Sequence, residues 1–183
     1  MSLVITGNPG VGKHTIAKSL AKVLGYEILD INKIALKFNL YEKTPETNDV
    51  DVLKVKNLLK KKISKKSLIV GHLAPYVLTK SQISKAIILR KNPYKLAQIY
   101  EKRKYSKRKT AENLGSEVLG IIAYETIKKF GKNKTIQVDT SSKSPSNITK
   151  HIKDILDGKS KTDSVDWLSS VTEKKDLQKF FPY

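Results

Sequence analysis

Residues 7–13 read Gly-Asn-Pro-Gly-Val-Gly-Lys, and this stretch decides the fold. Four residues separate Gly7 from the pair Gly12-Lys13, which is the spacing of a phosphate-binding P-loop. The β-prone run Ser2–Thr6 precedes the loop, and Lys13–Leu24 follows it with apolar residues at helical spacing. Strand, loop and helix in this order are the context that the motif requires, so we predict that residues 7–15 hold the phosphates of a nucleotide.

The predicted loop binds anions mainly through its backbone. Glycines permit a tight turn in which N–H groups face phosphate oxygens, and the helix N-terminus adds partial positive charge. Lys13 reaches the outer phosphates as a point charge. One departure is that His14 stands where a Ser or Thr usually ligates Mg²⁺, and the hydroxyl follows one place later at Thr15. The predicted ATP-binding residues of this segment are Gly10, Val11, Gly12, Lys13, His14 and Thr15.

The rest of the chain predicts an α/β fold. Apolar runs at 26–29, 67–70, 86–89 and 135–138 read as buried parallel strands, which makes five with residues 2–6. Asp30 suits the N-cap of a helix through about residue 38, and residues 50–63 have helical periodicity. Residues 93–130 predict a helix, a basic lid around 104–109 and a long helix, whereas 39–49 are polar and irregular. We predict one three-layer α/β/α domain over residues 1–183 with a five-stranded parallel sheet.

The charge is strongly positive. Thirty-six basic residues against 17 acidic ones give a net charge of +19, which favours polyanionic partners without identifying one. There is no cysteine and no apolar run near the length of a membrane span, so we expect a cytoplasmic protein without a membrane partner. The oligomeric state stays open.

Two further segments have open interpretations. The tail, about 159–183, is polar but contains Trp167 and several later aromatic residues, so it is either a docked strap or a partner-binding extension. The loop 138–141 has the position of an adenine-side loop, although a simple turn explains it nearly as well. Asp30 and Asp139 follow predicted strands, where either could organise Mg²⁺ through water, but helix capping also explains Asp30.

Beyond the P-loop, the chain resembles the adenylate kinase isoenzyme 6 family over nearly its whole length. These small nucleotide kinases also act in maturation of the small ribosomal subunit. The segments that carry the resemblance keep the family's order and spacing, and the tail segment is similar to archaeal members. They are Asn39-Leu40-Tyr41, Val50-Asp51, Gly71-His72, Leu89-Arg90, Arg103-Lys104-Tyr105-Ser106, Lys109, Glu112-Asn113, Glu117 and Val165-Asp166-Trp167.

The resemblance implies the reaction ATP + AMP = 2 ADP with ATP and Mg²⁺. It implies an AMP-binding region near 30–53, to which Asp30 and Asp51 belong, and a lid near 103–113. Arg103 would bind the ATP phosphates, and Thr15 would contact an inner phosphate and serve the metal. The implied catalytic residues are Lys13, Arg90, Arg103 and His72. Implied partners are a small-subunit ribosomal protein and rRNA.

The sequence itself supports part of this assignment. Arg90, Arg103 and Arg108 cluster in a lysine-rich chain, and a guanidinium fork suits phosphate. His72 follows a predicted strand and either orients the reacting groups or is an ordinary hydrogen-bonding residue. Two departures from the family argue for slow catalysis. Val70 replaces an acidic residue that would organise the metal, and in the lid Ile99 replaces an arginine and Lys104 a glycine.

Two other functions therefore stay open. One is an ATP-switched ribosome-assembly factor with little kinase activity, favoured by the +19 charge and by Val70. The other is a kinase of the shikimate type, with the same core and a different acceptor.

Overall fold

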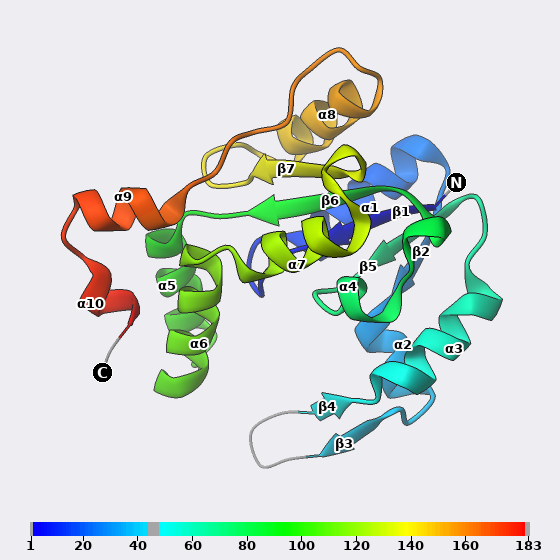
Figure 1. The fold of residues 1–183 in the computed structure, drawn as a ribbon, viewed down its shortest axis with the longest axis horizontal. Coiled ribbons are helices and arrows are strands. Elements are labelled where there is room, and N and C mark those ends of the chain that lie inside the picture. Colours follow the sequence, from blue (N-terminus) through cyan, green and yellow to red (C-terminus); the bar gives the residue numbers. More distant parts are fainter. Residues whose placement is uncertain (1, 44–47, 182–183) are drawn as a thin grey trace.

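A five-stranded parallel sheet forms the centre of the protein (Figure 1). The structure is a computed structural model, and it describes residues 2–43 and 48–181. The strand order is β2-β5-β1-β6-β7, and every pair of neighbours is parallel. The strands are β1 (Ser2–Thr6), β2 (Glu27–Asp30), β5 (Ser67–Val70), β6 (Ile83–Arg90) and β7 (Thr135–Asp139). The predicted α/β fold with five parallel strands is confirmed.

Helices cover both faces of the sheet and complete the three layers. Strand β1 shows why, since its side chains alternate between two buried clusters: Leu3 and Ile5 lie in one, and Val4 lies in the other. The first cluster includes residues of α1 (Lys13–Leu24), α5 (Pro93–Lys102) and α8 (Pro145–Leu156). The second includes residues of α3 (Val52–Lys62), α4 (Ala74–Val77) and α7 (Ile121–Phe130).

The segment between β2 and α3 is more regular than the sequence predicted. Asp30 caps α2 (Ile31–Lys37) as expected, with its side chain accepting from the Lys33 N–H. The chain then forms an antiparallel pair, β3 (Tyr41–Lys43) and β4 (Asn48–Val50), where we had expected irregular structure. Residues 44–47 of the expected irregular stretch lie outside the described residues.

The predicted long helix after the lid is two helices. Helix α6 (Lys107–Val118) ends before Gly120, whose φ of 66° lies in the left-handed region, and α7 begins at Ile121. The break between α5 and α6 is also shorter than the predicted lid. It spans 103–106, and Ser106 caps α6 by accepting from the Lys109 N–H.

The C-terminal tail is docked, which decides between the two interpretations of the sequence. Helices α9 (Trp167–Glu173) and α10 (Leu177–Phe180) lie beside α6 (Figure 1). Val171 and Phe180 are buried in the same cluster as α1 and α5, and the Phe180 ring packs edge-on against Tyr94 of α5. Short 3-10 turns at Lys80–Gln82 and Lys132–Lys134 flank the sheet. Among the described residues, none of the helices is long and apolar enough to cross a membrane.

Candidate functional site

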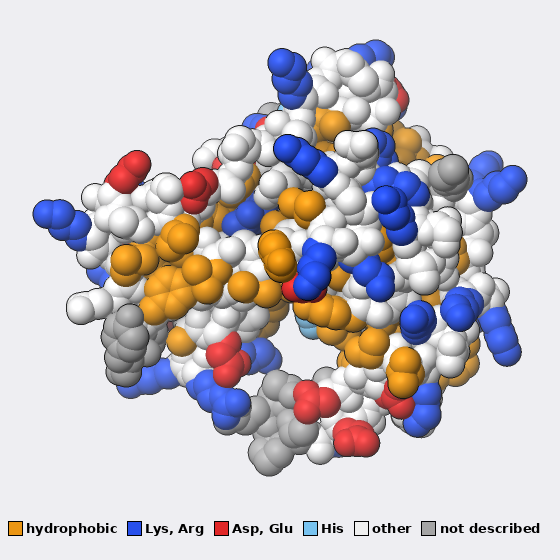
Figure 2. Space-filling model, in the orientation of Figure 1, with side chains coloured by type: hydrophobic (Ala, Val, Ile, Leu, Met, Phe, Trp, Pro, Cys, Tyr) orange, Lys and Arg blue, Asp and Glu red, His pale blue; other side chains and the backbone are white. Residues whose placement is uncertain are grey.

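A cavity of about 700 Å³ opens at the carboxyl ends of β1 and β5. Figure 2 shows the molecule hollowed between the α5–α6 pair and the β3–β4 hairpin. Such an edge is where ligands of open α/β sheets collect. Four parts of the chain line the cavity: the P-loop and start of α1, the region from α2 to β4, the turn after β5, and residues 103–113, the segment predicted to be the lid. The lining residues are Pro9, Gly10, Gly12, Lys13, His14, Thr15, Asn32, Ala35, Leu36, Tyr41, Asp49, Val50, Gly71, His72, Leu73, Arg103, Tyr105, Lys109, Glu112 and Asn113.

At its two ends, Gly7 and Gly12, the P-loop backbone has no room or no allowed conformation for a residue other than glycine. A Cβ on Gly7 would lie 2.3 Å from the carbonyl oxygen of Leu89, and Gly12 caps α1 with a φ of 97°. The Lys13 side chain folds back over the loop, and its Nζ donates to the carbonyl oxygens of Gly7 and Asn8, both at 2.8 Å. The loop and the ammonium group are thus held in one compact unit at the start of α1.

Lys13 is a buried cation. Its residue is only 8% exposed, and burial lowers the pKa of the ammonium group from 10.5 to about 8. Glu117 and Asp30 raise this pKa, and Arg103 lowers it. At neutral pH the group is still mostly charged.

His14 and Thr15 follow Lys13 on α1, and both side chains are exposed at the cavity. The Nε2 atom of His14 lies 2.8 Å from Oδ2 of Asp30, while Oδ1 of Asp30 caps α2. Asp30 therefore orients His14. It does not itself line the cavity.

Asp51, the other carboxylate expected in the AMP-binding region, is also a helix cap. Its side chain accepts from the Lys54 N–H at 3.0 Å, and it is absent from the cavity lining. In the β3–β4 hairpin that precedes Asp51, Asp49, Val50 and Tyr41 do line the cavity. The expectation that Asp30 and Asp51 face the acceptor is therefore not met in this structure, because both carboxylates serve helix N-termini.

His72 lines the cavity at the turn after β5. Burial, and then the nearby charge of Lys13, lower the pKa of its imidazole to about 4. At neutral pH His72 is uncharged and presents one donor and one acceptor. Val70, two residues earlier, is fully buried in the core, so β5 ends without the carboxylate that the family pattern places there.

The lid contributes Arg103, Tyr105 and Lys109 to the cavity. Its base is fixed, since Tyr105 stacks on Tyr100 at 5.2 Å between ring centroids, and the Tyr100 hydroxyl donates to the carbonyl of Pro9 at 2.7 Å. The Lys109 ammonium lies 4.6 Å above the Tyr105 ring. Tyr100 of α5 therefore connects the lid and the P-loop, because its ring stacks on Tyr105 and its hydroxyl bonds the P-loop backbone.

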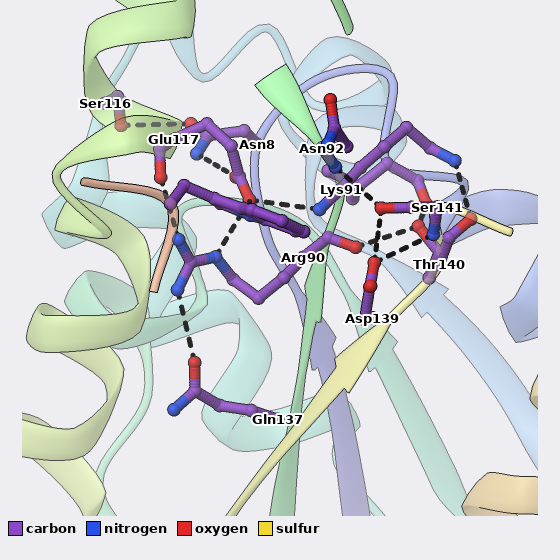
Figure 3. Close-up of polar contacts among 12 residues, drawn as sticks. Asn8, Arg90, Lys91, Asn92, Ser116, Glu117, Gln137, Asp139, Thr140 and Ser141 are labelled. Carbon is purple, nitrogen blue, oxygen red and sulfur yellow. Dashed lines mark hydrogen bonds and ion pairs between the residues drawn. The ribbon is translucent and has the colours of Figure 1, made fainter. Parts of the chain in front are cut away.

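Arg90 does not line the cavity, contrary to the expected phosphate contact. It is 4% exposed, and its Nε donates to Oε1 of Glu117 at 2.8 Å (Figure 3). Its other nitrogens donate to the Glu117 carbonyl at 2.7 Å and to Oε1 of Gln137 at 3.2 Å. The guanidinium fork is thus occupied within the protein and ties α6 to the sheet.

Sequence reasoning did not predict that Glu117 pairs with Asn8 of the P-loop. Asn8 Nδ2 donates to Oε2 of Glu117 at 2.7 Å, and the Glu117 side chain is fully buried. The available signal was its spacing, since Glu117 shares the apolar face of α6 with Leu114 and Val118. A carboxylate in such a stripe requires a buried partner.

The loop after β7 contacts the P-loop from another side. The Thr140 hydroxyl lies within hydrogen-bond distance of the carbonyl oxygens of Val11 (3.0 Å) and Arg90 (2.9 Å). Asp139 closes its own turn by accepting from the Ser141 N–H. Residues 2–43 and 48–181 hold no cluster of three His, Asp or Glu side chains that could bind a metal. In the cavity lining, the Thr15 hydroxyl lies at the start of α1, next to the P-loop backbone.

Three comparisons with known proteins agree with this geometry. Residues 3–120 match the family described as AAA domain. Two archaeal proteins described as "Putative adenylate kinase" are similar along most of the chain. The one from Thermococcus onnurineus is 31% identical over 170 residues, which cover 91% of each chain. The one from Sulfurisphaera tokodaii is 31% identical over 180 residues, covering 97% of this chain and 90% of that protein.

Solved structures show the same fold. Shikimate kinase from Aquifex aeolicus matches with a TM-score of 0.56 at 18% identity, over 86% of this chain and 97% of that one. Shikimate kinase from Acinetobacter baumannii, in complex with shikimate, matches with a TM-score of 0.60 at 16% identity, over 86% and 93%. With a P-loop at a nucleotide-sized cavity and relatives described as putative adenylate kinases over more than nine tenths of its length, the chain belongs to the AAA-domain family that matches residues 3–120 and is a P-loop nucleotide kinase.

Proposed function

We propose that the chain is an adenylate kinase, which transfers the γ-phosphate of ATP to AMP and forms two ADP. The observation that carries the proposal is one shared cavity of about 700 Å³, lined by the P-loop, by the α2–β4 region and by the lid. A phosphoryl donor and a nucleotide acceptor need such a shared space, because the reaction is an in-line displacement between two bound molecules.

The donor side of the proposed site is the P-loop. Its backbone amides and the α1 N-terminus take the ATP phosphates, and Lys13 lies beside them as a buried cation. Arg103 reaches the same cavity from the lid. Mg²⁺ would be held by phosphate oxygens and the Thr15 hydroxyl, where it would neutralise charge on the transferring group.

The acceptor side of the proposed site lies between α2 and the β3–β4 hairpin. Asn32 and Leu36 from α2, and Tyr41 and Val50 from the hairpin, line this part of the cavity. Apolar and aromatic walls with one amide suit a flat base. An oxygen of the acceptor phosphate attacks the γ-phosphorus, and the bond from that phosphorus to the β,γ-bridging oxygen breaks, which leaves ADP on both sides.

His72 has a positioning role in this proposal. Its imidazole is neutral at working pH and can hydrogen-bond one of the reacting phosphates without adding charge. Lys13, Arg103 and the metal would then stabilise the negative charge on the transferring phosphoryl group. The buried Val70 leaves the metal without a carboxylate at the end of β5, which argues for slow transfer.

The test is a coupled assay of ADP formation with ATP, Mg²⁺ and AMP, together with calorimetric titration of each nucleotide. ADP formation that depends on AMP, and its loss in Lys13→Ala, are expected. Shikimate is the matched control acceptor, because kinases with this fold phosphorylate it, and it should give no turnover. ATP binding without AMP-dependent ADP formation would reject the adenylate kinase reaction.

The missing carboxylate also favours a second candidate, an ATP-switched ribosome-assembly factor in which slow hydrolysis changes the protein's shape. Its proposed partners are a small-subunit ribosomal protein or rRNA, which the net charge of +19 would attract. Figure 2 shows Lys and Arg side chains spread over this face, so charge alone selects no docking surface. If His72→Ala blocks subunit maturation while phosphoryl transfer persists, hydrolysis serves the assembly role. Parallel loss in both assays would contradict that separation.

A further inference from the structure

Glu117 connects two parts of the chain that are far apart in sequence, the P-loop and the C-terminal tail. Its side chain is fully buried, and both carboxylate oxygens accept hydrogen bonds. Oε2 accepts from Asn8 Nδ2 at 2.7 Å. Oε1 accepts from Arg90 Nε at 2.8 Å, from the Lys91 N–H at 3.0 Å and from Trp167 Nε1 at 3.1 Å. The carboxylate thus accepts from four donors, three of them on Oε1, and these donors come from the P-loop, from β6 and the residue after it, and from the tail.

The P-loop end of this connection is equally well defined. The Asn8 side chain uses both of its polar atoms on α6, since Nδ2 bonds Glu117 and Oδ1 accepts from the Ser116 hydroxyl at 3.0 Å (Figure 3). The carbonyl of Asn8 in turn accepts from Lys13 Nζ at 2.8 Å. A shift of Asn8 therefore changes both the loop backbone and the support of the phosphate-binding ammonium.

At the other end of this connection, buried side chains and a hydrogen bond hold the C-terminal tail in place. Val171 is fully buried and Phe180 is 3% exposed. The Tyr94 hydroxyl donates to Asp176 at 2.7 Å, and the Tyr94 ring packs on Phe180. These contacts hold α9 against α6 and keep the indole N–H of Trp167 aimed at Glu117.

We propose that Trp167 and Glu117 are positioning residues of the nucleotide site, through which the docked C-terminal tail sets the conformation of the P-loop. The coupling runs from Trp167 to Glu117 to Asn8, and none of these three side chains lines the cavity. The proposal rests on nucleotide binding at the P-loop as proposed above. It adds that a segment outside the cavity controls affinity, so a partner that displaces the tail would weaken nucleotide binding.

Coupling of this kind is reciprocal. If the tail tightens nucleotide binding, then a bound nucleotide stabilises the docked tail and alters the surroundings of Trp167. The chain contains a single tryptophan, so its fluorescence reports on this one position. A nucleotide-dependent change in tryptophan emission is therefore a direct readout, which a purely structural role for Trp167 would not produce.

Glu117 also acts on Lys13 through charge. Burial lowers the pKa of Lys13, and Glu117 opposes this effect most strongly, helped by Asp30. Arg103 acts in the opposite direction, and His72 faces Lys13 as a neutral imidazole. In Glu117→Gln the Lys13 pKa should fall, so the loss of ATP affinity at alkaline pH should begin at lower pH than in the wild type.

The decisive experiment pairs two variants with one control in the full chain. Trp167→Phe keeps an aromatic side chain and removes the N–H, and it should weaken ATP binding about three- to tenfold in calorimetry, the effect of one lost hydrogen bond. Leu168→Ala trims an exposed side chain of the same helix and should leave affinity unchanged. Asn8→Ala cuts the connection at the loop, so ATP should bind more weakly, and saturating ATP should no longer change tryptophan emission.

The outcomes separate the two proposals. If the wild-type chain binds no ATP, the proposed function fails, and this inference falls with it. If the wild type binds ATP but Trp167→Phe matches Leu168→Ala in affinity, and ATP leaves wild-type tryptophan emission unchanged, the coupling is refuted and nucleotide binding stands. Because both side-chain variants leave the Arg90–Glu117 ion pair in place, the test does not depend on Glu117→Gln folding.

Discussion

Raising the pH should stabilise the nucleotide-free chain through Lys13, because folding buries its ammonium group. Burial lowers the Lys13 pKa from 10.5 to about 8. Between these two values the unfolded chain holds a proton that the folded chain has released. The unfolded state then binds more protons, so the free energy of unfolding rises with pH. The difference corresponds to roughly 3 kcal/mol for the complete titration, and most of this gain falls between about pH 7 and about pH 10.

The measurement is urea unfolding across this pH range for the wild type and for Lys13→Met, which fills the same space without an ionisable group. Subtracting the two stabilities removes the titration of all other groups, and the wild type should gain relative to the variant as pH rises. Lys18→Met changes an exposed lysine of the same helix and is the matched control, which should keep the wild-type dependence. Parallel curves for wild type and Lys13→Met would refute the argument that burial perturbs this lysine.

Three further changes test other features of the structure. Lys104 has a φ of 54°, so Lys104→Gly should raise the free energy of unfolding by up to about 1 kcal/mol. Lys102→Gly, at the C-terminal end of α5, should instead lower it, and a loss in both variants would contradict the backbone argument. Arg90→Lys cannot satisfy the acceptors around the buried guanidinium, so the free energy of unfolding in denaturant should fall by about 3 kcal/mol. The exposed Arg108→Lys is the control and should lower it by about 0.5 kcal/mol or less. Equal losses in the two variants would count against the network around Arg90. Tyr100→Phe keeps the ring stack but removes the bond to the P-loop backbone, so we expect a cost of about 1 kcal/mol in the same assay, and an unchanged midpoint would count against that bond.

The sequence predicted the parts of the fold that depend on local pattern. Buried parallel strands are short apolar runs on both faces, so all five were recognisable without knowledge of their neighbours. The P-loop was equally clear, because its glycines and lysine act at fixed spacing within one turn. The β3–β4 hairpin was not recognised, because its exposed strands carry no apolar alternation. The break at Gly120 was also missed, since a single glycine within a helical pattern is often tolerated.

The site was harder to predict wherever its geometry depends on distant partners. The clustering of arginines suggested phosphate contacts, but only the fold shows that Arg90 is paired with Glu117, 27 positions along the chain. Asp30 was correctly predicted to cap a helix, but the capping role of Asp51 was not predicted, because sequence cannot tell a capping carboxylate from one that faces a ligand. The docked tail was one of two open interpretations, because its few apolar residues gain a partner only when α5 and α6 are assembled.

The three anchors of the P-loop have a consequence for the cost of binding. Its Asn8 side chain and the carbonyls of Pro9 and Val11 are each held by a different element, through Glu117, Tyr100 and Thr140. Conformational entropy that a free loop would lose on meeting a phosphate has already been lost during folding. A ligand therefore binds to a P-loop that is already ordered. The entropic cost of association then falls mainly on the parts of the chain that must move to cover the bound ligand.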